Sequence, residues 1–124
     1  MSTWTPRDAR AIADPQEVEL ATRRRDGSLR TPRTIWIVRV GDDRVFIRST
    51  NGRGADWFRW AIATGLGQIS TSGATFDVTF SAASDDDLYA VDAAYRSKYG
   101  GYASIVDHLE GPGPRSATLE VIPA

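Results

Sequence analysis

Hydrophobic and polar residues alternate with a period of two along much of the chain, which is typical of β-strands with one buried face. In the segment 75–82, for example, Phe76, Val78 and Phe80 alternate with polar residues. The alternation predicts six strands, at residues 17–24, 31–40, 44–50, 67–71, 75–82 and 117–122. Short turns at 26–27 and 41–43 join the first three strands, so we expect an antiparallel meander.

Three other segments have the spacing of amphipathic helices. Residues 6–13 begin with a proline, 55–64 place two tryptophans on one face, and 84–99 open with a pattern that resembles a capping box. A further helical turn is expected at 105–109. Six antiparallel strands with helices inserted after the third and the fifth predict an α+β fold, in which the sheet closes wholly or partly into a barrel.

The length and composition fit one domain over residues 1–124. The chain has no cysteine, which excludes disulfides, thiolate catalysis and cysteine-ligated metal. It has one histidine, His108, so a multi-histidine metal site is excluded and no metal is expected. No apolar run approaches the roughly 20 residues of a membrane span, and the N-terminus does not resemble a signal peptide, so we expect a cytoplasmic protein.

The charge is unevenly distributed although the net charge is only −1. Residues 23–59 carry ten arginines against four aspartates, whereas 60–124 carry three bases against eight acids. A basic middle in a nearly neutral chain suits a small anion better than a long nucleic acid, which usually requires a basic face across the domain. The alternative is that the arginines cover exposed strand faces.

The densest group of candidate binding residues lies in the segments 30–36 and 48–54. The first begins the second predicted strand, and the other ends the third strand and opens a helix. Since the turn at 41–43 would bring both segments to the same end of a hairpin, we expect Arg30 and Arg33 close to residues 49–53. Guanidinium groups, hydroxyls and the free N–H groups of a helix N-terminus are the components of a phosphate site. A purely structural role is the alternative.

The same residues carry a resemblance to a known family. The segments "DGSLRTPRTIWIV" and "RVFIRSTNGRGADWF", with the helix that follows them, resemble the flavin-binding split β-barrels of the pyridoxamine-phosphate-oxidase-like superfamily. Within it they are most similar to the branch that holds the deazaflavin-dependent nitroreductases and small bacterial relatives. The resemblance covers the middle third of the chain well, and it implies a six-stranded split barrel.

The resemblance also implies a cofactor, FMN or a deazaflavin coenzyme. The cofactor-binding residues that it implies are Arg30, Arg33, Thr34, Trp36, Ser49, Thr50, Asn51, Arg53 and Trp57. The isoalloxazine-type ring would lie near Trp36, at a position where relatives often have a proline, so this indole could stack on the ring or block it. Trp57 has core spacing on its helix, so it either packs there or stacks on a ligand.

The side chains offer little catalytic chemistry of their own, so no catalytic residue is assigned and a cofactor must supply the reaction. We expect an oxidoreductase that transfers hydride or electrons to a small conjugated acceptor. The alternatives are a carrier of flavin or haem without turnover, and a barrel that has lost its cofactor. His108 is expected in a surface turn or cap, with a haem ligand or general base as the alternative. The resemblance further implies a homodimer that binds small molecules, and neither nucleic acid nor a membrane is expected as a partner.

Overall fold

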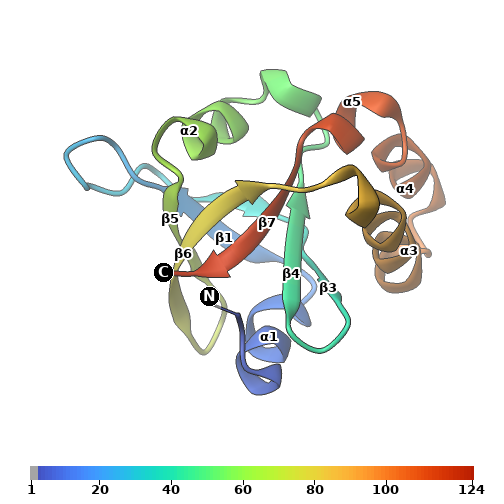
Figure 1. The fold of residues 1–124 in the computed structure, drawn as a ribbon, viewed down its shortest axis with the longest axis horizontal. Helices are drawn as coiled ribbons and strands as arrows, with labels where there is room; N and C mark the ends of the chain where they lie inside the picture. The colour runs from blue at the N-terminus through green and yellow to red at the C-terminus, as the bar shows by residue number, and fades with distance from the viewer. Residues whose placement is uncertain (1–2) are drawn as a thin grey trace.

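Seven strands and five α-helices follow one another along residues 3–124, the part of the chain that the computed structural model describes (Figure 1). The strands are β1 (Val18–Thr22), β2 (Arg33–Ile35), β3 (Val38–Val40), β4 (Arg44–Arg48), β5 (Leu66–Ser70), β6 (Thr75–Ala82) and β7 (Thr118–Pro123). The helices are α1 (Pro6–Ala13), α2 (Asp56–Thr64), α3 (Leu88–Tyr99), α4 (Ala103–Leu109) and α5 (Pro112–Ser116).

The strands form one antiparallel sheet in the order β2-β1-β5-β6-β7-β4-β3. Strands β2 and β3 lie at opposite ends of this order, yet only Trp36 and Ile37 separate them along the chain. The sheet therefore has to curl until its two ends meet, as Figure 1 shows. The predicted α+β barrel is confirmed, with seven strands rather than six.

The prediction of a single strand over 31–40 is wrong because the chain bends at Trp36 and Ile37. The backbone N–H of Ile37 donates to the hydroxyl of Tyr99 at 3.1 Å, and its carbonyl accepts from the amine of Lys98 at 2.7 Å. These side chains of α3 occupy the backbone groups that a continuous strand would pair. The first half, β2, pairs with β1, and the second half, β3, pairs with β4 across the predicted 41–43 turn.

The three predicted helices are present. Thr5 caps α1 by accepting the N–H of Asp8 at 3.1 Å, and Gly65 ends α2 in the left-handed region with a φ of +70°. Helix α3 begins at Leu88, after a 3-10 turn at Asp85–Asp87, and Ser84 makes no side-chain cap. None of the helices within residues 3–124 is long and apolar enough to cross a membrane.

The segment after α3 is more helical than predicted. The turn expected at 105–109 is the helix α4, which begins at Ala103. The glycine- and proline-rich stretch that follows contains α5, with Pro112 in its first turn, where the missing N–H of proline costs nothing. Helices α3, α4 and α5 gather on one side of the barrel, next to β3 and β4 (Figure 1).

Two clusters of buried side chains make up the core. The first fills the barrel and is apolar, with Val45 and Ile47 of β4 among its members. The second, which we call the seam, lies between the outer face of β3 and β4 and the helices α3 and α4. Phe46, Tyr95 and Tyr99 belong to the seam. The strand β4 is thus buried on both faces.

Candidate functional site

A cavity of about 210 Å³ lies at one end of the seam. It is lined by Glu17, Thr34, Ile35, Trp36, Arg48, Thr50, Trp57, Tyr95 and Leu109. These residues come from the position before β1, β2 and its bend, the end of β4 and the loop after it, the first turn of α2, and the helices α3 and α4. Arg48, Tyr95 and Leu109 are buried, whereas Glu17, Thr34 and Thr50 are exposed, so the former make the inner wall and the latter the mouth.

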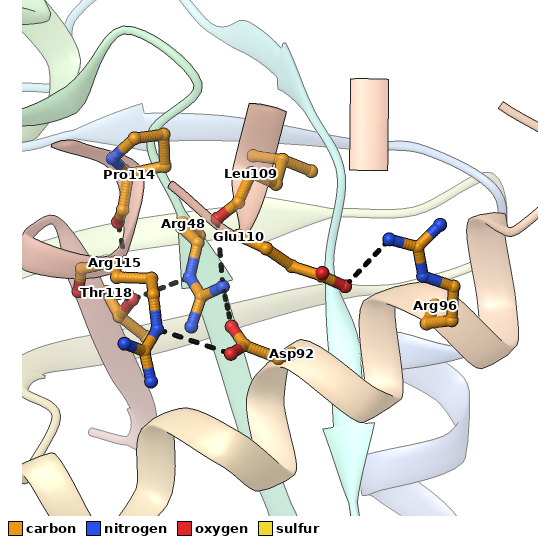
Figure 2. Close-up of polar contacts among 8 residues, drawn as sticks. All are labelled: Arg48, Asp92, Arg96, Leu109, Glu110, Pro114, Arg115 and Thr118. Atoms are coloured by element: carbon orange, nitrogen blue, oxygen red, sulfur yellow. Dashed lines mark hydrogen bonds and ion pairs between the residues drawn. The ribbon is translucent and has the colours of Figure 1, made fainter. Parts of the chain in front are cut away.

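Arg48 is the buried charge of this site, with a fully buried side chain. Its Nε donates to the hydroxyl of Thr118 at 2.7 Å, and its Nη1 donates to a carboxylate oxygen of Asp92 at 2.5 Å and to the carbonyl of Leu109 at 3.1 Å. Figure 2 shows these three hydrogen bonds. It also shows a second arginine, Arg115, whose Nε lies 3.2 Å from the other carboxylate oxygen of Asp92. The ion pair therefore ties β4 to α3, α4 and β7.

Two polar atoms of the inner wall have no hydrogen-bond partner among residues 3–124. They are the Nη2 of Arg48 and the hydroxyl of Tyr95. Burial raises the pKa of Tyr95, and the nearby guanidinium and backbone N–H of Arg48 offset this only in part. Tyr95 is therefore a neutral phenol at pH 7 whose proton lacks an acceptor. A buried donor left unpaired is costly, and it marks a place where a polar ligand or water fits.

Aromatic side chains form much of the remaining wall. The indole of Trp36 stacks on the ring of Tyr99 with centroids 4.0 Å apart and planes 1° apart, and Tyr102 lies against it at 5.5 Å. The hydroxyl of Tyr99 also donates to the carbonyl of Gln16 at 2.8 Å, and burial raises the pKa of Tyr99 to about 12. These contacts hold Trp36 in place beside the cavity.

Four of the nine predicted cofactor-binding residues line the cavity together: Thr34, Trp36, Thr50 and Trp57. The hydroxyl of Thr34 donates to the carboxylate of Glu19 at 2.7 Å. Trp57 is half-buried and packs against the barrel core, so it combines packing with a place in the cavity wall. The expectation that the ends of the two segments approach each other holds for Thr34 and Thr50.

The expectation that Arg30 and Arg33 lie close to residues 49–53 is not met. Both guanidiniums lie over the indole of Trp60 on α2, at 4.5 Å and 5.3 Å from its centroid. Arg33 is exposed and stands opposite Leu20 of β1 in the sheet register, because β2 pairs with β1 and not with β4. Among residues 3–124, neither arginine pairs with a carboxylate. They form a basic surface next to the cavity, which we call the arginine–tryptophan surface.

The other predicted residues lie around the cavity without lining it. Ser49 is buried and its hydroxyl has no partner within the described chain, whereas Asn51 is exposed. Arg53 donates to the carbonyl of Ser116 at 2.9 Å and lies over the ring of Phe58. His108 is exposed near the end of α4, and its Nε2 lies 2.6 Å from the carbonyl of Thr50. Since a carbonyl only accepts, Nε2 carries the hydrogen.

Arg48, Asp92 and Tyr95 are absent from the predicted site residues. The signal for Arg48 was weak, because Phe46 is the one apolar residue on a strand face that also carries Arg44 and Arg48. No pattern in the sequence pairs Arg48 with Asp92. Within residues 3–124, no three His, Cys, Asp or Glu side chains come together in a way that could hold a metal ion.

The strand order, the closure at the bend and the helices on one side define a split β-barrel. Solved structures share this fold. The heme storage protein HutZ from Vibrio cholerae has a TM-score of 0.64 at 14% identity, over 95% of this chain and 87% of HutZ. A putative pyridoxamine 5'-phosphate oxidase from Listeria innocua has a TM-score of 0.56 at 11% identity, over 96% of this chain and 91% of that one.

A heme binding protein from Mycobacterium smegmatis has a TM-score of 0.64 at 17% identity over 94% of this chain, which spans half the length of that protein. The chain belongs to the family described as "Uncharacterized protein conserved in bacteria (DUF2255)", which matches residues 8–121. No curated protein matches it in sequence. The structural likenesses show the fold, and membership of the flavin-binding superfamily and of its nitroreductase branch stays a prediction.

Proposed function

We propose that this protein binds an anionic flavin-type cofactor, FMN or a deazaflavin coenzyme, and uses it to transfer hydride or electrons to a small conjugated acceptor. The observation that carries the proposal is the adjacency of the arginine–tryptophan surface and the aromatic cavity. Helix α2 carries Trp57 in the cavity wall and, one turn later, Trp60 under the two arginines. Strand β2 likewise carries Thr34 in the wall and Arg33 beside it.

The arginine–tryptophan surface suits the phosphate end of such a cofactor. Two guanidiniums without carboxylate partners stand on one indole, which holds them in place by cation–π contact. The Nε of Arg30 is buried and has no hydrogen-bond partner among the described residues. A phosphate binds guanidinium groups by paired, charge-assisted hydrogen bonds, so it would satisfy these donors.

The cavity suits the edge of the ring system and the acceptor. Its volume of about 210 Å³ is below the range of about 300–1,000 Å³ of pockets that enclose drug-sized ligands, so a tricyclic ring would cover the mouth and not enter it. The residues present therefore fit a flavin-type group across the mouth. When bound, it would supply the redox chemistry, while Trp36 and Trp57 orient the ring and the cavity keeps water from the acceptor.

The test is the visible absorption spectrum of the purified protein before and after incubation with FMN and with a deazaflavin coenzyme. Retained yellow absorption after gel filtration is the expected result. Oxidation of a reduced nicotinamide or deazaflavin donor at steady state then distinguishes an oxidoreductase from a carrier. A colourless protein that retains neither cofactor would contradict the proposal and would favour a barrel that has lost its cofactor.

Haem is the second candidate, because two of the structural neighbours are described as heme proteins. Its propionates are anionic and would use the same two arginines. His108 is the only histidine, and its Nε2 would have to leave the carbonyl of Thr50 to reach iron. A strong Soret band on addition of haem that His108→Ala abolishes would favour this candidate over flavin.

We further propose that two copies assemble across the face that carries the arginine–tryptophan surface. Leu29 and Leu66 are 37% and 43% exposed and flank Arg23, which bridges to Leu29 and donates its N–H to the carbonyl of Leu66 at 3.0 Å. Such an exposed apolar pair beside a ligand site is typical of a surface that a partner covers. A mass near 27 kDa by light scattering is expected for the dimer, about twice the 13.6 kDa chain. A stable monomer at micromolar concentration would contradict it.

A further inference from the structure

The buried guanidinium of Arg48, in the inner wall of the seam cavity, shares its carboxylate with an arginine outside the cavity lining. Arg48 and Arg115 share a single carboxylate, that of Asp92. The side chain of Arg115 is 28% exposed, so water compensates part of its charge, whereas the side chain of Arg48 is fully buried and has only this shared carboxylate. Since a buried charge without full compensation is costly, the cluster favours an anion from outside the chain. Glu17 is the one acidic residue in the cavity lining, and it stands exposed at the mouth, where water and salt screen its charge.

The two unpaired donors of the inner wall belong to this cluster. The guanidinium of Arg48 lies over the ring of Tyr95, 5.6 Å from its centroid, and both residues line the same cavity. Nη2 of Arg48 is left free after the bonds of Arg48 to Thr118, Asp92 and Leu109 are counted (Figure 2). The phenol hydroxyl of Tyr95 likewise has no partner among the described residues. A carboxylate has two oxygens and accepts without donating, which matches one N–H and one O–H donor.

The size and walls of the cavity restrict what the carboxylate is attached to. The volume of about 210 Å³ exceeds the roughly 150 Å³ of an apolar protein cavity that binds benzene. Trp36 and Trp57 offer aromatic surfaces, and Ile35 and Leu109 are aliphatic. Flat apolar walls on a volume of this size suit a single planar ring.

We infer that the inner seam cavity binds the carboxylate of a small, one-ring aromatic acid through Nη2 of Arg48 and the hydroxyl of Tyr95. The inference deepens the proposed function, since it identifies the acceptor of a flavin-type cofactor at the mouth as an aromatic or similarly conjugated carboxylic acid. The carboxylate site does not include Arg30 or Arg33, so it can be tested without any cofactor.

The test uses titration calorimetry of the cofactor-free protein with benzoate and with benzamide, its neutral isostere. Benzoate is expected to bind, and benzamide about tenfold or more weakly, because only the carboxylate compensates the charge of Arg48. Tyr95→Phe, which removes one hydroxyl, is expected to weaken benzoate about tenfold. Tyr89→Phe is the matched control, since it removes the hydroxyl of a tyrosine that is 78% exposed and outside the cavity lining, and it should leave the affinity unchanged.

Equal affinity for benzoate and benzamide, or no loss in Tyr95→Phe, would overturn the inference. If Tyr95→Phe does not fold, the side-chain Nε–H resonance of Arg48 in the wild-type protein gives a second measurement. Benzoate must shift it, and an unmoved resonance at saturation would overturn the inference. Benzoate binding by a protein that takes up no flavin would refute the proposed function alone. Flavin uptake without benzoate binding would refute this inference alone.

Discussion

The two faces of strand β4 differ in what they bury. The inner face places Val45 and Ile47 in a barrel core made of apolar side chains. The outer face places Phe46 in the seam and then, two residues later, Arg48, whose guanidinium is as deeply buried as the ring of Phe46. On its inner face, the strand is thus stabilised by apolar contacts alone. On the other side the protein carries a buried ion pair, two unpaired donors and a cavity.

The comparison indicates that the two faces of β4 serve different purposes, stability on one and binding on the other. Apolar burial in the barrel needs no directional partner and stabilises the fold in proportion to area. A buried ion pair at the seam does little for net stability, because desolvation offsets much of the attraction, so its retention points to binding. Substitutions on the two faces of β4 should therefore differ in their effects on stability and on binding.

Removing one partner of the buried pair is expected to have the largest effect. Asp92→Ala leaves Arg48 without a carboxylate in the seam, and the expected loss is about 3–5 kcal/mol in the free energy of unfolding. Denaturant titration measures it. The double variant Arg48→Met with Asp92→Leu removes both charges and should recover most of the loss. A double variant as unstable as Asp92→Ala would mean that the pair itself stabilises the fold.

A cavity in the barrel core is expected to cost somewhat less. Ile47→Ala removes buried methyl groups from an apolar cluster, and the expected loss is about 2–5 kcal/mol in the free energy of unfolding. Benzoate or flavin binding below the new melting temperature should be unchanged, because Ile47 faces away from the seam. Weakened binding in the folded variant would show that the two faces are not separate.

The pH dependence of stability should reflect the raised pKa of Tyr99 in the seam. The folded pKa of Tyr99, about 12, lies above the value of 10.0 for an unperturbed tyrosine, because burial disfavours the phenolate. The unfolded chain therefore loses this proton first. The contribution of Tyr99 to stability is fully present below pH 10 and is lost as the pH rises to about 12.

In Tyr99→Phe the slope of the unfolding free energy between pH 10 and 12 should be shallower by about one proton, and Tyr102→Phe should keep the wild-type slope. The variant itself will be less stable, since Tyr99 also bonds Ile37 and Gln16. The slope and not the absolute stability is therefore the readout. Identical slopes in all three proteins would be the contrary result.

Most of the fold could be predicted because its signals are local. Alternation marks the strands, Pro6 and Gly65 mark helix ends, and the 41–43 turn sets the pairing of β3 with β4. The break at Trp36 and Ile37 could not be predicted, since its cause is the side chains of Lys98 and Tyr99, about sixty residues away. The six-strand count was wrong by one for that reason.

The candidate site was only partly predictable. Thr34 and Thr50 both line the cavity, although β2 pairs with β1 and forms no hairpin with β4, and Trp36 and Trp57 join them. Arg30 and Arg33 turn instead toward Trp60, because the broken strand pairs with β1. Arg48 and Tyr95 come together only because α3 packs on β4, and the sequence of neither segment predicts that contact.

The central claim, that the arginine–tryptophan surface and the cavity beside it form a cofactor site, is tested most directly by calorimetric titration with FMN and with a deazaflavin coenzyme. Arg33 is exposed, so Arg33→Ala should leave stability within about 0.5 kcal/mol of the wild type. It should nevertheless weaken cofactor binding by about 1.5–3 kcal/mol and make binding less sensitive to salt. Arg44→Ala, which removes an arginine bonded to Asp87 and Glu120 away from this surface, should change neither affinity nor salt dependence. Equal affinities for the wild type and Arg33→Ala would contradict the claim.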